Sequence, residues 1–457
     1  MDVIVIETTQ LGDRSYLVHD GSVALVIDPQ RDTDRVEAAA RGAGVRITHV
    51  AETHIHNDYI TGGLELARAH GASYLVNAAD PVTFERQPIA DGQTVRVGAL
   101  SVKAVATPGH THTHLSFIVN DGEQQAVFSG GSLLYGSVGR TDLVGTEDTL
   151  GLTHDQYASV RRLAGEAAPG AGLFPTHGFG SFCSSGPASG AGSSTIGAQL
   201  TSNHALTDPD EDHFVQELIA NLTAYPSYYA HMGVANTAGP GPADLTVPEA
   251  LDAGELMRRL EAGEWVVDLR RRVAFASSHL KGSVSFGYGN SFSTYLGWVM
   301  PWGEQLTLVG SRADVENAIR DLARIGVDSP DAALGTDPHF LAPRAAVASF
   351  PCVGWDGVPA TRSGGADAVV DVRRTEEYAA SRVAGPVNVP LHELLPRLAD
   401  LPVGRLWVHC TSGYRAGIAA SLLQRAGRDV VLIDARFDDA EAAGIQLEKS
   451  GVAFGGG

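Results

Sequence analysis

Short runs of β-branched and other apolar residues alternate with polar turns through the first 120 or so residues. Strand patterns occur in VIVIET, SYLVHD and VALVIDP, and again in TVRVGALSVKAVATP, LSFIVND and AVFSGG. Among them lies a helical pattern, DTDRVEAAARGAG, with Asp32 and Thr33 as capping candidates and Gly42 near its end. ITHVAETH then predicts a buried strand that leads into a polar loop. This order indicates a β-rich α/β domain, in which ligands usually bind at loops that leave strand ends.

The composition of the chain changes after the third histidine cluster. Residues 178–207 are dense in glycine and serine, which is compatible with a flexible linker or with a long, partly docked loop. DEDHFVQELIANL follows with a helical pattern. PGPADLTVP then predicts a domain boundary, because proline interrupts both helices and strands.

The remainder contains an internal repeat of about 100 residues. WVVDLRRRVAFASSHLKGSVSF aligns without gaps with AVVDVRRTEEYAASRVAGPVNV, so that Asp268 matches Asp371. LTLVGSRADVENAIRDLARIG then aligns with LWVHCTSGYRAGIAASLLQRAG after a one-residue gap. Each copy predicts a strand, a loop, a strand, and then a loop and a helix. We therefore expect two tandem α/β domains, at 246–340 and 350–457.

Composition narrows the functional class. The 457 residues suffice for about three domains, and the hydrophobic fraction of 44% is that of a globular protein. A net charge of −20 argues against binding to a nucleic-acid backbone. We find no long uncharged apolar run and no signal-peptide pattern in MDVIVIETT, so we expect no membrane span and no export. Only three cysteines occur, widely spaced, which favours a reducing cytoplasm.

Histidines cluster where predicted strands end in the first part of the chain. One cluster is His-x-His-x-Asp, a second is PGHTHTH and a third is PTHG; their candidate ligands are His54, His56, Asp58, His110 and His177. Imidazole and carboxylate groups are ligands for zinc and iron. Three histidine clusters, each at a strand-to-loop junction, favour a metal site over a chance grouping of structural histidines.

The HxHxD loop, TPGHT and PTHG together resemble the metallo-β-lactamase-fold hydrolases, above all the glyoxalase II and persulfide dioxygenase branch. GRTDL at 139–143 points to the persulfide dioxygenases. The resemblance covers about residues 1–235. It implies an αββα sandwich over residues 1–240, with a metal at one edge of two packed sheets.

Two positions depart from that family. Tyr59 stands where the family motif continues with a histidine, and Gly131 stands where the family has a metal-binding aspartate. The resemblance therefore implies one divalent metal, Fe(II) or Zn, on a three-histidine face. We predict that this face consists of His54, His56 and His110, with Asp58 and His177 nearby. Tyr59, Arg140 and Asp142 are predicted around the same site, with Asp142 as a substitute carboxylate.

The last repeat ends a predicted strand in Cys410, which Thr411, Ser412, Gly413 and Tyr414 separate from Arg415. Consecutive backbone N–H groups ahead of a helix create an anion site and favour a thiolate nucleophile. VVDVR, VNVPL and CTSGYRA resemble the rhodanese sulfurtransferases over about residues 350–440. A cysteine phosphatase loop has five residues between cysteine and arginine, and this loop is one residue shorter.

The first repeat copy has Gly310 in the place of Cys410, so we expect a rhodanese-like domain without a nucleophile. Its His279 lies where members of that family have a histidine, which indicates that the fold is kept. We interpret Cys183 as a loop residue, with a persulfide relay as the alternative, and assign Cys352 no role.

Together these patterns predict a cytoplasmic enzyme of sulfur metabolism. Cys410 and Arg415 would transfer sulfane sulfur, and the first domain would oxidise a persulfide. The alternatives are a glyoxalase II-like thioester hydrolase and a non-catalytic binding module joined to a rhodanese. The expected partners are a small persulfide, thiosulfate or thiol, without nucleic acid or membrane. The oligomeric state stays open, a homo-oligomer included.

Overall fold

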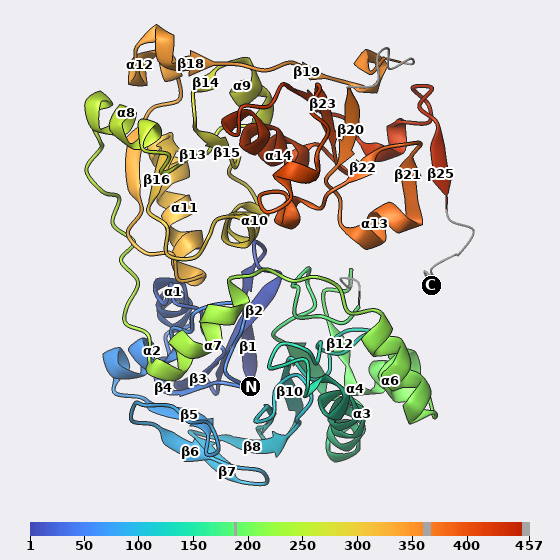
Figure 1. The fold of residues 1–457 in the computed structure, drawn as a ribbon. Helices are drawn as coiled ribbons and strands as arrows, with labels where there is room; N and C mark the ends of the chain where they lie inside the picture. Colours follow the sequence, from blue (N-terminus) through green and yellow to red (C-terminus); the bar gives the residue numbers. More distant parts are fainter. Residues whose placement is uncertain (187–189, 360–366, 450–457) are drawn as a thin grey trace. The chain divides into compact units, whose positions relative to one another are not determined.

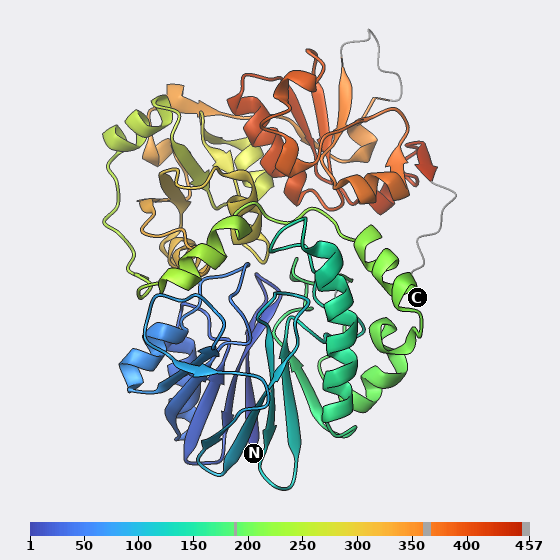
Figure 2. The same cartoon turned by 60° about the horizontal axis from the view of Figure 1, so that its bottom comes forward.

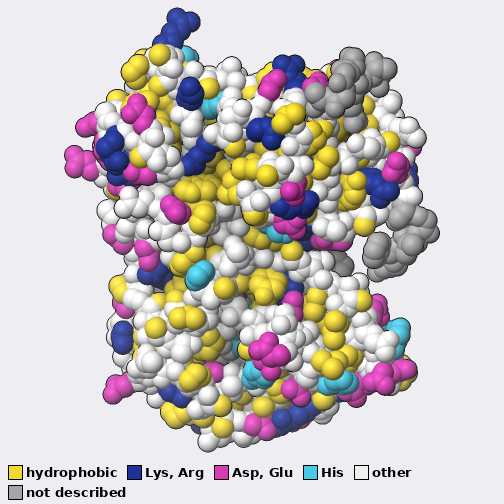
Figure 3. Space-filling model, viewed as in Figure 1, with side chains coloured by type: hydrophobic (Ala, Val, Ile, Leu, Met, Phe, Trp, Pro, Cys, Tyr) yellow, Lys and Arg dark blue, Asp and Glu magenta, His cyan; other side chains and the backbone are white. Residues whose placement is uncertain are grey.

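The computed structural model describes residues 1–186, 190–359 and 367–449. Short parts of the predicted glycine-serine loop and of the predicted 350–457 domain lie outside these residues. The chain divides into two compact units, which are Met1–Asp244 with Arg320–Asp328, and Leu245–Ile319 with Ser329–Gly457 (Figure 1). Within the described residues, no helix is long and apolar enough to cross a membrane. On the face drawn in Figure 3, basic and acidic side chains are interspersed.

Two six-stranded sheets form the first unit. One sheet has the order β1 (Asp2–Thr8), β2 (Asp13–His19), β3 (Val23–Ile27), β4 (Arg46–Ala51), β5 (Ser73–Asn77) and β6 (Gln87–Ile89). The other has the order β12 (Ser194–Thr195), β11 (Gly172–Pro175), β10 (Gln125–Gly130), β9 (Leu115–Asn120), β8 (Leu100–Ala106) and β7 (Thr94–Val97). Figure 2 shows the two sheets packed face to face.

The core between these sheets is apolar and closed to solvent. Tyr16, Leu25, Phe117 and Phe128 meet there with no exposed surface. Helices cover the outer faces: α1 (Asp34–Ala43) and α2 (Gly63–His70) pack on one sheet, and α3 (Thr149–Glu166) and α6 (Glu211–Ala220) lie beside the other (Figure 2). This layering is the predicted αββα sandwich, because each sheet has one apolar face toward its partner and another toward helices.

The glycine-serine segment is partly docked, as the second of the two alternatives predicted. Strand β12 pairs with β11, and α4 (Ile196–Ser202) and α5 (His204–Thr207) follow it. Ile196 and Cys183 have no exposed surface, so parts of the segment are buried. The helical extension ends with α7 (Tyr229–Ala238).

The second unit contains two parallel sheets of matching order. The first sheet runs β15 (Val284–Ser285), β13 (Trp265–Asp268), β16 (Leu306–Gly310), β17 (Asp331–Leu334). The second runs β22 (Val387–Asn388), β20 (Ala368–Asp371), β23 (Leu406–His409), β24 (Val430–Ile433), and β19 (Cys352–Val353) extends it beyond β24. The strands within the repeats carry almost continuous apolar runs, as expected for sheets covered on both faces.

Some helices and short strands of the first repeat have counterparts in the second. The first repeat contains α8 (Ala253–Glu261), α9 (Arg272–Ser277), α10 (Phe292–Val299), α11 (Arg312–Arg324) and α12 (Pro338–Leu341), although the residues of α11 from Arg320 onward are grouped with the first unit. The second contains α13 (Thr375–Ala380) and α14 (Tyr414–Arg425). Strand β14 (His279–Leu280) pairs with β18 (Val347–Ala348), and β21 (Ser381–Val383) pairs with β25 (Leu447–Lys449). By position, α9 corresponds to α13 and α11 to α14.

Candidate metal centre and cysteine loop

The four histidines predicted near a metal all follow strands of the first unit. His54 and His56 come after β4, His110 after β8 and His177 after β11. These strands belong to both sheets, so the side chains converge at a shared edge of the sandwich. Each of the four residues is at most 1% exposed. A charged imidazole there would lose its hydration, and it would need a partner.

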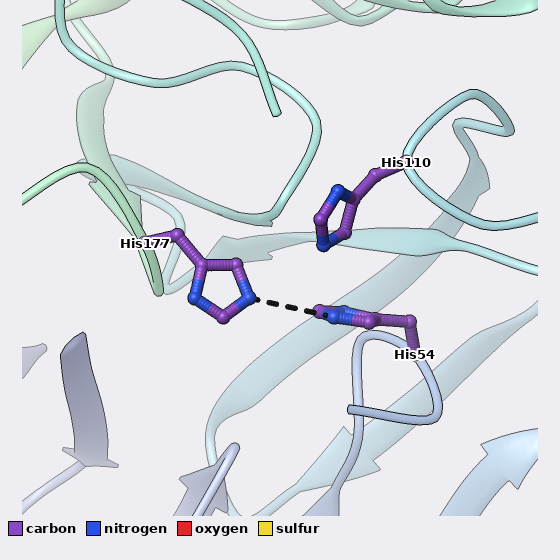
Figure 4. A group of neighbouring side chains, drawn as sticks. All are labelled: His54, His110 and His177. Carbon is purple, nitrogen blue, oxygen red and sulfur yellow. Dashed lines mark hydrogen bonds between the residues drawn. The ribbon is translucent and has the colours of Figure 1, made fainter. Parts of the chain in front are cut away.

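Three of these histidines meet at one point. His54, His110 and His177 each offer one ring nitrogen, and the three nitrogens lie within 4.8 Å of one another. We call these residues the three-histidine group. Figure 4 shows their rings facing one another, with Nε2 of His177 3.4 Å from Nε2 of His54. Burial lowers the pKa of all three imidazoles, so they are neutral and able to bind a metal.

The outer nitrogens of two rings are fixed by acceptors. Nδ1–H of His177 donates to Oδ1 of Asp13 at 2.9 Å. Nδ1–H of His110 donates to the carbonyl oxygen of Arg140 at 2.8 Å. Because a neutral imidazole carries a single N–H, Nε2 of each ring is left with a lone pair.

The third ring is oriented through a hydroxyl group. The hydroxyl of Thr53 donates to Oδ2 of Asp28 at 2.7 Å, so it accepts Nδ1–H of His54 at 2.9 Å. All three Nε2 atoms therefore carry lone pairs and face one another. Nε2 of His110 has no hydrogen-bond partner among the described residues. These three Nε2 lone pairs fit a bound cation. Hydrogen bonds from the outer Nδ1–H groups to fixed acceptors are typical of metal-binding histidines.

The predicted nucleophile lies in a short loop of the second unit. Cys410 follows β23, and Thr411, Ser412 and Gly413 connect it to α14, which begins at Tyr414. Gly413 has a φ of 89° and its backbone N–H donates to Sγ of Cys410 at 3.2 Å. Cys410 is 1% exposed. The sulfur thus lies at a helix N-terminus with an amide directed at it, an arrangement that stabilises negative charge.

Arg415 turns toward a carboxylate on α13. Its Nη1 lies 2.6 Å from Oε2 of Glu377, and its Nη2 lies 2.8 Å from Oε1. Thr411 donates its hydroxyl to Glu377 at 2.8 Å. Burial alone would raise the pKa of Glu377, but Arg415 lowers it to about 2. The guanidinium is thus held by Glu377 beside the loop, and sequence reasoning did not identify that partner.

The two sites coincide with two known kinds of domain. Residues 9–178 match the metallo-beta-lactamase superfamily, and residues 360–442 match the rhodanese-like domain. The chain combines an N-terminal metallo-beta-lactamase domain with a C-terminal rhodanese-like domain. Both resemblances predicted from the sequence motifs are confirmed, as is the α/β fold class.

Relatives of the metallo-beta-lactamase domain carry several activities in their names. Human mitochondrial persulfide dioxygenase ETHE1 is 27% identical over 54% of this chain and 84% of its own length. Hydroxyacylglutathione hydrolase of Acidiphilium cryptum (strain JF-5) is 37% identical over 23% of this chain and 44% of its own length. This chain thus spans less than half of that hydrolase. A metallo-beta-lactamase crystal structure from Staphylococcus aureus subsp. aureus COL matches with a TM-score of 0.65 and 26% identity, covering 73% of this chain and 98% of its own.

Gly131 leaves the metallo-beta-lactamase domain without the carboxylate that the family resemblance implies. A Cβ atom at this position would lie 2.1 Å from Cδ2 of His110, so the imidazole ring occupies the space that a side chain would need. The N–H of Gly131 donates to Nε2 of His114 at 3.0 Å. An aspartate could enter here only if His110 moved.

His56 lies outside the three-histidine group, although the sequence analysis placed it on the metal face in preference to His177. Its Nε2 lies 3.3 Å from Oδ1 of Asp28, 3.2 Å from Oε2 of Glu52 and 3.0 Å from the hydroxyl of Tyr59. Burial alone would lower the pKa of His56, but the two carboxylates raise it to about 10. His56 therefore forms part of a buried ion cluster with Asp28 and Glu52, which distinguishes it from the three neutral rings.

Asp58 lies behind the three-histidine group. Its Oδ2 is 3.3 Å from Nδ1 of His177, the nitrogen that also faces Asp13. Burial, with the neighbouring carboxylate, raises the pKa of Asp58, and burial raises that of Asp13. Asp58 can also join His56 and His177 in a second set of potential ligands.

The predicted substitute carboxylate, Asp142, is engaged by Arg140. Nε of Arg140 lies 2.6 Å from Oδ1 and Nη2 lies 2.8 Å from Oδ2 of Asp142. Asp142 belongs to none of the potential ligand sets found among the described residues.

Cys183 lies beside the same arginine, since the backbone N–H of Arg140 donates to the carbonyl oxygen of Cys183 at 2.9 Å. Burial raises the pKa of the Cys183 thiol, which keeps it protonated.

Sequence reasoning missed the residues that orient the ligands. Asp28 follows β3 with a φ of 51°, and its carboxylate accepts the backbone N–H of Thr53 at 2.7 Å and the hydroxyl of Thr176. Asp13 begins β2 and holds His177. An acid directly after a buried apolar strand, as in VALVIDP, was the available signal for Asp28. Asp13 offered no comparable pattern.

Proposed function

We propose that this chain is an enzyme of sulfur metabolism that transfers sulfane sulfur through a persulfide on Cys410. The observation that carries the proposal is the Gly413 N–H directed at Sγ of Cys410, at the N-terminus of α14. The rhodanese-like match and the similarity to a persulfide dioxygenase support the same area of chemistry.

The transfer has two displacement steps. The Cys410 thiolate attacks the outer sulfur of thiosulfate, the S–S bond breaks, and sulfite leaves with the electron pair. A thiolate acceptor then attacks the outer sulfur of the Cys410 persulfide and regenerates the Cys410 thiolate. A persulfide donor follows the same course with a thiolate as the leaving group. The N–H of Gly413 stabilises the negative sulfur before and after each displacement.

Replacing the nucleophile tests this proposal. Cys410→Ser is expected to lower sulfur transfer from thiosulfate to a thiol by at least about 10³-fold, because serine is a far poorer sulfur nucleophile. Cys352→Ser is the matched control, and it should keep the activity of the parent protein. Circular dichroism checks that both variants fold. Full activity of Cys410→Ser would overturn the proposal.

We further propose that the three-histidine group holds one divalent metal, Fe(II) or Zn, in the metallo-beta-lactamase domain. When bound, the metal supplies a Lewis acid with an open coordination position and, if it is iron, a redox centre. Asp13, Thr53 and the carbonyl of Arg140 hold the rings in the tautomer that turns Nε2 inward. The overall reaction converts a thiol persulfide, dioxygen and water into the thiol, sulfite and two protons. The persulfide released by Cys410 chemistry is the substrate class that this reaction consumes.

A thioester hydrolase is the second candidate function of the metallo-beta-lactamase domain. A histidine-only ligand set suits zinc, and similarity to a hydroxyacylglutathione hydrolase supports it. The hydrolase would use a metal-activated water, which the dioxygenase does not need.

Elemental analysis of freshly purified protein, followed by oxygen uptake on glutathione persulfide, separates these functions. Iron with oxygen uptake and sulfite formation is the expected result, whereas zinc with thioester cleavage would favour the hydrolase. Protein without metal and without oxygen uptake would leave a binding module and overturn the metal proposal. His110→Ala should lose the metal. His112→Ala, at an exposed histidine two residues away, is the control and should keep it.

We also propose domain boundaries at 1–240, 246–340 and 350–457. The support is the strand order of the second unit, in which β15, β13, β16 and β17 correspond to β22, β20, β23 and β24. In this division the first repeat is a rhodanese-like domain without a nucleophile.

A further inference from the structure

The first repeat contacts the Cys410 loop through an arginine. Arg272 begins α9, and its Nε lies 2.6 Å from Oδ1 of Asp434, which follows β24. Its Nη2 donates to the carbonyl oxygen of Ser412 at 3.0 Å. One guanidinium thus joins a carboxylate of the second repeat to the backbone of the loop that holds the nucleophile.

The loop and its helix leave room for this side chain. A Cβ atom at Gly413 would lie 2.7 Å from Nε of Arg272 and 2.2 Å from Oδ1 of Asp434. A Cβ atom at Gly417, one turn into α14, would lie 2.8 Å from Cβ of Arg272. Glycine at both positions therefore lets the arginine lie directly against the loop.

Other contacts hold the same two surfaces together. The hydroxyl of Tyr414 donates to the carbonyl oxygen of Gly287 at 3.1 Å. Further along α14, Oε1 of Gln424 accepts a hydrogen bond from Nε2 of His279 at 2.6 Å. The helix behind Cys410 is thus packed along the first repeat, and Arg272 contacts the loop itself.

Peptide geometry connects Arg272 to the sulfur. The carbonyl of Ser412 and the N–H of Gly413 belong to one planar peptide unit and point in opposite directions. Fixing the oxygen on Arg272 therefore fixes the direction of the N–H that donates to Sγ of Cys410. A cation on the carbonyl also polarises the peptide and strengthens the N–H as a donor.

We propose that Arg272 is a positioning residue for Cys410, supplied by the repeat that lacks a nucleophile. It holds the Ser412–Gly413 peptide in the orientation that stabilises the thiolate and the persulfide. This inference rests on the proposed sulfur transfer at Cys410, and it gives the first repeat a part in that reaction beyond packing.

Arg272→Met is the decisive variant, because methionine keeps an apolar stem over Gly417 and removes the guanidinium. We expect kcat/KM for sulfur transfer to fall ~10-fold, as for one lost hydrogen bond to a charged group. The rate of Cys410 alkylation by iodoacetamide should fall by about the same factor, since alkylation reports the thiolate without any sulfur donor. Mass spectrometry of the peptide containing Cys410 measures this rate separately from Cys183 and Cys352.

Two further variants complete the test. Arg271→Ala removes the same charge from an adjacent, exposed position and should react like the parent protein. Arg272→Lys keeps a cation near Asp434 and Ser412 and should recover part of the alkylation rate, which a purely structural loss would not predict. If Arg272→Met does not fold, Arg272→Gln, which also removes the charge, takes its place and is compared with Arg271→Ala.

Alkylation and transfer within twofold of the parent protein in Arg272→Met would overturn the inference. The same result in Arg272→Gln would do so if Arg272→Met is unfolded. Failure of the proposed function has a different signature: Cys410→Ser would keep its activity. In that case the alkylation rate still decides whether Arg272 positions the loop.

Discussion

The two repeats of the second unit keep the same largely buried ion pair at the same place. In the first repeat, Nη2 of Arg270 lies 2.6 Å from Oδ2 of Asp268 at the end of β13. In the second, Nη2 of Arg373 lies 2.7 Å from Oδ2 of Asp371 at the end of β20. Both aspartates also accept the backbone N–H of the arginine that pairs with them, at 2.9 and 3.0 Å. This pair belongs to the fold and carries no information about activity.

The loops after the next strand differ. Cys410 is followed by three residues before α14 begins, and the Gly413 N–H reaches its sulfur. Gly310 is followed by Ser311 alone before α11 begins, and Ser311 donates to the carboxylate of Asp314 at 2.6 Å. The comparison teaches that the scaffold is shared by both repeats, whereas the anion site depends on two extra loop residues.

The largest expected effect tests whether the cysteine alone makes the site. Gly310→Cys in a Cys410→Ser background should restore no measurable sulfur transfer, at least about 10³-fold below the parent protein. In the short loop, Ser311 and Asp314 hydrogen-bond to each other, and the Asp314 carboxylate disfavours a thiolate nearby. Transfer from thiosulfate to a thiol measures this. Restored activity would mean that the loop length does not distinguish the repeats.

The shared ion pair predicts similar losses of stability in both repeats. Asp371→Asn should lower the free energy of unfolding by about 3–5 kcal/mol, because it leaves a buried guanidinium without its counter-ion, and Asp268→Asn should cause a similar but smaller loss at the part-buried Arg270. Denaturant unfolding followed by fluorescence measures the effect. Asp142→Asn at an ion pair of the first unit should leave the transition of the second unit unchanged. A loss in only one of the two repeats would contradict the equivalence.

Acid should distinguish the repeats through His409, which stands where the first repeat has Val309. Burial lowers the pKa of His409 to about 4, below the 6.5 of an unfolded histidine. The unfolded chain therefore takes up the proton first. The contribution of neutral His409 to the free energy of unfolding is therefore complete above about pH 6.5. It is lost as the pH falls toward 4, by about 3 kcal/mol in total.

His409→Val should remove this share of the acid sensitivity. The measurement is the free energy of unfolding at pH 7, 6, 5 and 4 for both proteins, compared as slopes so that any packing change cancels. A variant with the same slope as the parent protein would show that His409 is not the titrating group.

Much of this comparison could be predicted from the sequence. The repeat, the place of Cys410 and the missing nucleophile at Gly310 follow from strand patterns and from an alignment of the two copies with a single one-residue gap, because local sequence determines them. The histidines at the ends of β4, β8 and β11 could be predicted for the same reason.

The partners of those residues could not be predicted. His56 differs from His177 because Glu52 and Asp28 reach it from two strands, and only the fold brings these acids together. Glu377 binds Arg415 from a helix 38 residues earlier in the chain. Local sequence patterns predict the position of a functional residue at the end of a strand. The protonation state of its side chain depends on partners that only the fold brings close.

The smallest expected effect separates packing of the repeats from positioning of the loop. Oγ of Ser421 in α14 accepts the backbone N–H of Ser285 at 2.9 Å, and both residues are buried. Ser421→Ala leaves that N–H without an acceptor and should lower the free energy of unfolding by about 1–2 kcal/mol. Thermal unfolding measures the loss, and sulfur transfer should stay at the parent level because Ser421 does not contact the loop. A fall in transfer like that expected for Arg272→Met would mean that general contact between the repeats, and not the guanidinium on Ser412, orients the Gly413 N–H.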